Sequence, residues 1–328
     1  MQFVDMLLEK LSERAKTKEP LNIVQWLNFT TFDIIGELSF SEPFFCLENN
    51  GYHPWVSFIF RGIQGAALRR FLHYYPLLEW LVQTVNLSSK MKSILQIRSS
   101  AKDKAKARMA HGLQPLHDHA DFIYYMLKPT RDGADGMSAK EALANSPTLV
   151  IAGSETTATA LSGFCFYISR NAKAYALLAG EIRAAFAQEE DINLRSTASL
   201  EYLQACINEI LRAYISVYQW ATFRNPENFV EPDSYLPERW LSETHELYEE
   251  RFSSDKRAVF KPFSHGPRDC IGKNLAFAEM RLIICRLLLR FDFELAHPQD
   301  HWHDNQRTFG LWEKGPLYLR LTERSVTE

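Results

Sequence analysis

The sequence has few cysteines, no excess of basic residues and no long apolar run. Its 328 residues include five cysteines, widely spaced and without a C-x-x-C pair, so neither a disulfide framework nor a zinc ribbon is expected. Lys and Arg total 37 against 40 for Asp and Glu, which gives no electrostatic reason to expect a nucleic-acid partner. No stretch approaches the roughly 18 apolar residues of a membrane span, and the N-terminus lacks the basic start of a signal peptide. The sequence therefore predicts a protein of a reducing compartment, with no membrane anchor in this chain.

The chain is rich in apolar and aromatic residues. Hydrophobic residues make up 46% of it, aromatic residues 13% and charged residues 23%, which excludes a disordered chain and supplies a large core. Apolar residues spaced three and four apart predict a mainly α protein with a small β part. The predicted helices cover residues 3–11, 22–38, 86–110, 138–170, 199–212 and 274–291. The alternating segments 307–312 and 316–321 predict a β-hairpin near the C-terminus.

The longest predicted helix begins at Ser138. Ser138-Ala-Lys-Glu141 is a capping box, in which the serine accepts from the third backbone N–H and the glutamate returns to the cap. Pro147 lies inside this helix and is expected to kink it or to cost it one hydrogen bond.

The segment 111–136, before this helix, is predicted to be mostly loop. It carries three histidines, His111, His117 and His119, which are either a metal cluster or part of a solvated loop. The loop is the favoured interpretation, because no second ligand group has metal spacing.

The most informative segment is Phe263-Ser-His-Gly-Pro-Arg-Asp-Cys-Ile-Gly272, which places one cysteine between two glycines before an apolar helix. Gly266 permits a tight turn, and Gly272 permits the backbone to approach a flat ligand closely. The N-terminus of the helix that follows would stabilise a thiolate at Cys270, as an axial haem ligand requires. Arg268 is a candidate partner for a porphyrin propionate.

Other interpretations of Cys270 remain open. Taken alone, it would most often be a buried cysteine in a loop before a helix. A zinc site with His265 lacks two further ligands, and a nucleophilic cysteine lacks a base partner. The complete pattern, Phe-x-x-Gly-x-Arg-x-Cys-x-Gly, resembles the signature of the cytochrome P450 family of haem-thiolate monooxygenases at every fixed position.

A second motif agrees with this resemblance. Ala152-Gly-Ser-Glu-Thr-Thr157 is similar to the family's oxygen-binding helix. The resemblance implies that Ala152, Gly153 and Phe263 line the haem, with room for dioxygen at the first two. It also implies that Glu155 and Thr156 relay protons to the oxygen. Taken alone, a helix of small residues with Glu-Thr-Thr is more often a packing or capping feature.

A third motif is the Glu-x-x-Arg of Glu209 and Arg212, whose spacing places both charges on one helix face. Alone, such a pair is usually solvated. The resemblance implies that it joins Arg239, from Pro237-Glu-Arg-Trp240, in a buried structural network that holds the Cys270 loop.

The resemblance covers most of the chain from about residue 20 and is strongest to fungal members of secondary metabolism. It implies a single domain over residues 1–328 and haem b with Cys270 as the iron ligand. Two electrons would come from NADPH through an NADPH–cytochrome reductase, and one atom of dioxygen would enter an apolar small molecule. The resemblance also implies a monomer at the cytosolic face of the endoplasmic reticulum. Lys261, Lys273 and Arg281 lie either on the reductase-docking side or on a merely solvated face.

Two pieces of the family pattern are expected to be missing. One is the N-terminal anchor with the early helices, and the other is a segment near residues 215–216. A catalytically inactive remnant that does not retain haem is therefore one alternative. A haem-thiolate isomerase or dehydratase, which needs no external electrons, is another, but the Glu155–Thr156 pair serves oxygen activation and argues against it. A helical interaction protein would leave the Gly and Cys spacing as coincidence.

Overall fold

A computed structural model describes residues 1–54, 56, 70–85, 100–117, 119–215, 219–308 and 311–324. Its α-helices are α1 (Gln2–Ala15), α2 (Ile23–Phe40), α4 (Pro76–Val85), α6 (Ser100–Ala110), α7 (Phe122–Leu127), α8 (Ala139–Ser169), α9 (Ala172–Ala185), α10 (Glu201–Ile210), α11 (Trp220–Phe223) and α12 (Lys273–Arg290). Its strands are β1 (Leu21–Asn22), β2 (Phe291–Leu295), β3 (Arg307–Thr308), β4 (Trp312–Glu313) and β5 (Tyr318–Glu323). The prediction of a mainly α protein with a small β part is confirmed.

The chain divides into two compact units by its internal contacts. The first consists of Met1–Leu27, Thr156–Gln306 and Lys314–Glu328, and the second of Asn28–Glu155 and Arg307–Glu313. Neither unit is continuous in sequence, and α8 contributes residues to both. The division therefore does not test the prediction of one domain over residues 1–328.

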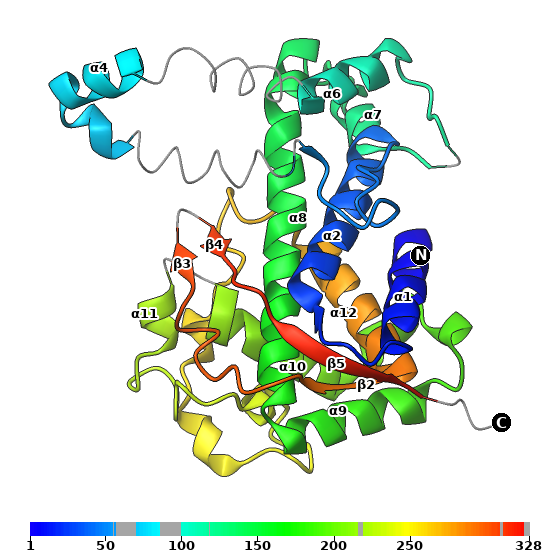
Figure 1. Cartoon of the computed structure of the whole chain (residues 1–328), viewed down its shortest axis with the longest axis vertical. Coiled ribbons are helices and arrows are strands. Elements are labelled where there is room, and N and C mark those ends of the chain that lie inside the picture. Colours follow the sequence, from blue (N-terminus) through cyan, green and yellow to red (C-terminus); the bar gives the residue numbers. More distant parts are fainter. Residues whose placement is uncertain are drawn as a thin grey trace. The chain divides into compact units, whose positions relative to one another are not determined.

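The first unit is built on α1, α9, α10 and α12, of which α1 and α12 contact a small sheet (Figure 1). The sheet has the order β1-β5-β2, and both pairings are antiparallel. Helix α12 is buried along most of its length because apolar residues occupy nearly all of its second half, from Leu282 to Leu289. This helix begins directly after the Cys270 loop (residues 263–272), so the core of the unit positions that loop.

The predicted C-terminal hairpin is wrong. β3 pairs with β4 in a separate two-stranded ladder, with Thr308 opposite Trp312. β5 instead pairs with the whole length of β2, from Phe291 opposite Glu323 to Leu295 opposite Leu319. The alternation of apolar and polar residues that suggested a hairpin is present, since Leu319 and Leu321 are buried. Such alternation indicates which face of a strand is buried, but it does not specify the neighbouring strand.

Helix α8 begins and ends close to its predicted limits. Ser138 Oγ accepts from Glu141 N at 3.3 Å, and Glu141 Oε2 accepts from Ser138 N at 2.8 Å, so the capping box is confirmed. Pro147 lies inside the helix and does not end it. α8 also has the length and hydropathy of a membrane span, but 72% of that window is buried within the protein, as in a core helix.

Other predicted helices differ at their edges. Of the predicted helix 86–110, residues 86–99 lie outside the described residues and the remainder forms α6. The predicted loop 111–136 contains the short helix α7, which Asp121 caps by accepting from Tyr124 N at 2.8 Å. The helix at 199–212 ends as a wider π-turn, Leu211–Ile215. The predicted missing segment adjoins residues 216–218, which also lie outside the described part of the chain.

Close packing of α8 in the first unit depends on Gly163. A Cβ at this position would overlap the buried ring of Tyr214, at 2.9 Å from its Cγ. That ring is held from behind by stacking on Trp302, at a centroid distance of 5.6 Å, and by the bond from its hydroxyl to Gln306. The ring therefore has little freedom to move away.

Gly163→Ala is accordingly expected to lower the free energy of unfolding by about 1–3 kcal/mol, the usual cost of overpacking. Gly180→Ala in α9 is the matched control, because no atom lies within 4 Å of its Cβ position. This control should be neutral or stabilising by about 0.5–1 kcal/mol, since glycine disfavours a helix. Urea unfolding of both variants tests the difference, and equal effects would show that the Tyr214 contact does not matter.

Candidate functional site

The Cys270 loop is a tight turn closed by its own backbone. Cys270 N donates to Phe263 O at 2.9 Å, and Asp269 N donates to Gly266 O at 3.0 Å. Gly266 has φ +91°, a conformation that side chains disfavour, so the loop needs glycine there. The turn that the sequence predicted at Gly266 is present.

The loop delivers Cys270 to the N-terminus of α12. Gly272 is the N-cap residue, and the first-turn bond runs from Ala276 N to Gly272 O at 2.9 Å. The unpaired N–H groups and the dipole of an N-terminus favour a negative charge nearby, here a thiolate. A Cβ on Gly272 would have a single neighbour within 4 Å, Cys270 Sγ at 3.9 Å. A side chain at Gly272 would therefore occupy the space beside the sulfur, which the glycine leaves open to a flat ligand.

Cys270 differs from the other four cysteines in being exposed. The other four are Cys46, Cys165, Cys206 and Cys285. Burial raises the pKa of Cys46, Cys165 and Cys285 to about 12, and it raises the pKa of Cys206 well above its usual range. Since the thiolate is the form that binds a metal, those four are poor ligands and Cys270 is the accessible candidate.

Apolar side chains belong to the same loop as the exposed sulfur. Phe263 is half-buried and packs against Phe277 of α12, at a centroid distance of 5.2 Å. Ile271, next to Cys270, is 96% exposed, which is unusual for an apolar side chain of this size. Arg268 is exposed as well and forms no ion pair with another described residue. The loop thus presents a thiol, apolar surface and a cation together.

The Ala152–Thr157 segment of α8 has one exposed stripe. Ala152 and Thr156, four residues apart and hence on one face, are exposed, whereas Glu155 and Thr157 are buried. Helix geometry separates Glu155 from Thr156 by about 100° around the axis. Of the proposed acid–alcohol pair, Thr156 is therefore the member at the open surface.

Gly153 has a packing reason to be glycine. A Cβ there would overlap the side chain of Ile35 in α2, at 2.8 Å from its Cγ1. Packing was the alternative that the sequence left open for this motif, and it accounts for Gly153. The exposed position of Ala152 is the part of the motif that packing does not explain.

The charges of Glu209, Arg212 and Arg239 meet in a buried network. Arg212 binds Glu209 through two hydrogen bonds, at 2.6 and 2.9 Å, and Arg239 Nε lies 3.3 Å from Glu209 Oε2. Arg239 also pairs with Asp255 at 2.6 Å, and the four side chains are at most 1% exposed. Burial lowers the pKa of Arg212 and is the largest single influence on it, but the charge and hydrogen bonds of Glu209, with the charges of Tyr167 and Asp255, together outweigh burial, so the pKa is raised.

Two members of this network were not among the predicted residues. Asp255 follows a polar run without any motif, so no local signal marked it. Trp240 ends the Pro237–Trp240 motif, which predicts no role for it, and its Nε1 donates to Glu209 Oε2 at 2.8 Å. The ring of Trp240 packs on Phe260 at a centroid distance of 4.4 Å, three residues before the Cys270 loop. Trp240 therefore links the network to the start of that loop.

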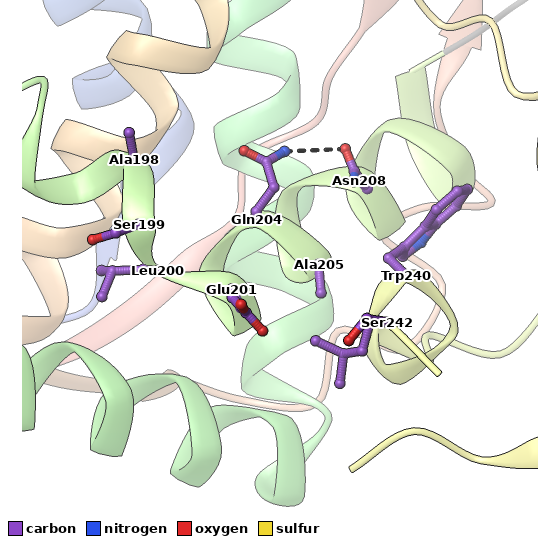
Figure 2. A pocket seen from close by; sticks show the side chains of 10 residues that line it. Ala198, Ser199, Leu200, Glu201, Gln204, Ala205, Asn208, Trp240 and Ser242 are labelled. Atoms are coloured by element: carbon purple, nitrogen blue, oxygen red, sulfur yellow. Dashed lines mark hydrogen bonds between the residues drawn. The ribbon is translucent and has the colours of Figure 1, made fainter. Parts of the chain in front are cut away.

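The first unit also has a surface cavity of about 250 Å³ beside α10 (Figure 2). It is lined by Ala198, Ser199, Leu200, Glu201, Gln204, Ala205, Asn208, Trp240, Leu241 and Ser242. Gln204 donates to Asn208 Oδ1 at 3.2 Å and accepts from Arg281 Nη1 at 3.3 Å. Arg281 is thus engaged by α10, whereas Lys261 and Lys273 are exposed. No residue of the Cys270 loop lines this cavity.

Two of the three loop histidines lie beside one carboxylate. His117 Nε2 and His119 Nε2 are 3.7 and 3.6 Å from Glu37 Oε1, and both imidazoles are about half exposed. Within the described residues, no group of three or more His, Cys, Asp or Glu side chains is arranged to hold a metal ion.

Comparison with known proteins shows the family. The sequence model of the family described as "Cytochrome P450" matches residues 1–219 and 213–320. The chain is 39% identical to the cytochrome P450 monooxygenase astJ of Aspergillus oryzae, over all of this chain and 69% of that relative. It is 36% identical to aclL of the same fungus, over 97% of this chain and 68% of the relative. It is 35% identical to the trichothecene C-4 hydroxylase of Trichoderma arundinaceum, over 99% of this chain and 70% of the relative.

These alignments also bear on the length of the chain. The astJ alignment has 357 positions against 328 residues here, so at least 29 of its positions have no residue of this chain. The two segments matched by the family model overlap at residues 213–219, around the place where a missing segment was predicted.

Proposed function

The chain belongs to the cytochrome P450 family, and on that premise we propose that it is a monooxygenase that holds haem b through the thiolate of Cys270. The observation that carries this proposal is the placement of Cys270. Cys270 is exposed, whereas the other four cysteines are buried. It lies at the N-terminus of α12, beside a glycine that leaves the sulfur uncovered.

The residues present on the thiolate side fit the group. The sulfur has open space at Gly272, apolar surface from Phe263 and Ile271, and the N-terminal turn of α12 behind it. When bound, haem would supply the activation of dioxygen, with two electrons from NADPH through an NADPH–cytochrome reductase. Cys270 would hold the iron, and Arg268 would pair with a propionate.

The network of Glu209, Arg212 and Arg239, with Asp255 as its fourth charge, would support this site. Its four buried charges fix Trp240, and Trp240 packs on Phe260 at the start of the Cys270 loop. Arg212 also donates to the carbonyl oxygens of Pro232 and Ser234, at 2.6 and 2.8 Å. Arg212 and Trp240 therefore both hold the irregular segment that precedes the Cys270 loop.

The substrate would be an apolar small molecule of fungal secondary metabolism, which gains one oxygen atom while the second leaves as water. In this proposal the enzyme is a monomer at the cytosolic face of the endoplasmic reticulum, where the reductase would meet it. The test is expression with a haem precursor, followed by a reduced carbon monoxide difference spectrum and a search for NADPH-dependent products that carry one added oxygen. The red-shifted thiolate band would support the proposal. Its absence would favour the alternative of an inactive remnant.

Thr156 would hold a proton at the exposed face of α8 and pass it on. The buried carboxyl of Glu155 would supply that proton. General acid assistance is worth roughly 10²–10⁴-fold. Thr156→Ala in the haem-loaded protein should therefore keep NADPH consumption, while product per NADPH falls about tenfold or more and hydrogen peroxide rises. Thr156→Ser, which keeps the hydroxyl, is the control and should retain coupling. If Thr156→Ala were as well coupled as Thr156→Ser, Thr156 would have no part in proton delivery.

A further inference from the structure

Helix α12 carries a buried acid that the proposed chemistry does not use. Glu279 lies in the second turn of α12 and is 7% exposed, and neither of its carboxyl oxygens has a hydrogen-bond partner among the described residues. The polar side chain that acts on it is Thr157 of α8, itself 3% exposed. The Thr157 hydroxyl is near enough to lower the pKa of Glu279 slightly, although the hydrogen bond between them is not well formed.

Among the described residues, no ion pair joins a cation to this carboxyl. Of the charged groups on α12 and on the elements packed against it, Arg286 pairs with Asp5 of α1 and with Glu189, Arg290 pairs with Glu189, and Arg183 of α9 pairs with Asp292. Arg281 donates to Gln204 of α10, Glu181 of α9 accepts from the backbone N–H groups of Tyr202 and Leu203, and Lys273 is exposed at the helix start. A bare carboxylate at such a position would be costly, because a buried charge without a partner loses its hydration and gains nothing in return. The neutral acid is the form that the surroundings accept.

We propose that Glu279 is a proton-operated latch between α12 and α8. With its proton, the acid can donate to the Thr157 hydroxyl, and α12 meets α8 at this point without a counter-charge. When the proton leaves to solvent, the carboxylate draws in water and a cation, and this contact between the two helices loosens. Because α12 starts directly after the Cys270 loop, loosening of the latch also increases the mobility of the end of the loop that joins α12. Glu279 and Thr157 both belong to the first unit, so the latch operates with or without haem.

The titration of the group agrees with this geometry. Burial raises the pKa of Glu279 from 4.5 to about 8, and the opposing effect of Thr157 does not cancel it. The folded state therefore holds the proton more tightly than the unfolded state does. The stability that this group contributes is complete below about pH 4.5, declines as pH rises and is lost above about pH 8.

Urea unfolding of the chain from pH 5 to pH 9 tests the latch. Through Glu279 alone, the folding equilibrium constant should fall roughly ten- to a thousand-fold over this range, since each unit of pKa shift corresponds to about tenfold. Glu279→Gln keeps the shape and a donor for Thr157 but cannot ionise, so it should remove this part of the pH dependence. Glu9→Gln, at an exposed position of α1, is the matched control and should leave the decline unchanged. Equal pH profiles for the two variants would overturn the proposal.

A second measurement does not depend on the variant folding. Infrared spectroscopy of the unmodified chain at pH 6.5 should show the carbonyl band of a buried protonated carboxyl, and this band should convert to a carboxylate band as pH passes about 8. A spectrum with no protonated carboxyl at pH 6.5 would overturn the proposal even if Glu279→Gln cannot be prepared. Neither measurement uses haem, so a failure of the proposed function would leave the result for Glu279 unaffected.

Discussion

Replacing Cys270 by alanine is expected to abolish the thiolate-type carbon monoxide spectrum of the haem-loaded protein completely. The reason is that none of the other four thiols can take the place of this ligand. Cys46, Cys165, Cys206 and Cys285 are buried, and burial raises the pKa of each thiol, so none offers an accessible thiolate.

The four single substitutions of these buried cysteines by alanine are the controls, and each should leave the position of the band unchanged. A thiol count on the unfolded and folded chain adds a readout that needs no haem. One thiol should react rapidly in the folded protein, and Cys270→Ala should remove it. If Cys270→Ala kept the thiolate band, the assignment of Cys270 as the iron ligand would be wrong.

Glu209→Gln is expected to lower the free energy of unfolding by about 3–5 kcal/mol, the cost of removing one partner from a buried ion pair. The substitution keeps the shape of the side chain but leaves Arg212 and Arg239 with one carboxylate, Asp255, where there were two. Arg212 and Arg239 are at most 1% exposed, so water cannot compensate for the lost charge. The expected result is a large drop in the urea midpoint, together with loosening of the segment around Trp240.

Asp233→Asn provides the matched control for this prediction. Asp233 pairs with Arg224 at 2.7 Å in the same irregular segment, but its side chain is 76% exposed. Exposed pairs contribute about 0–1 kcal/mol, because solvent screens them. An effect of Glu209→Gln no larger than that of Asp233→Asn would mean that the network does not stabilise the fold.

Local sequence was sufficient to predict the features of this protein that short-range physics decides. The capping box at Ser138 and Glu141 marked the start of α8, because the bonds that cap a helix join residues three apart. The turn at Gly266 followed from the freedom of glycine to adopt positive φ. Apolar spacing placed α2, α10 and α12 within a few residues of their observed limits. The motif around Cys270 was enough to indicate the family.

Only the tertiary structure decided which side chains meet and which are covered. Asp255 joins Glu209 and Arg239 from 46 and 16 positions away along the chain, and no periodicity reports such a meeting. β5 pairs with β2, although β4 is the strand nearest to it in sequence. Gly153 faces Ile35, and Glu279 lies buried without a hydrogen-bond partner among the described residues, although both belong to segments whose helical structure was predicted. The physical reason is common to these cases: a helix or strand is determined by neighbours a few residues away, whereas burial, ion pairing and pKa depend on surroundings that only the folded chain assembles.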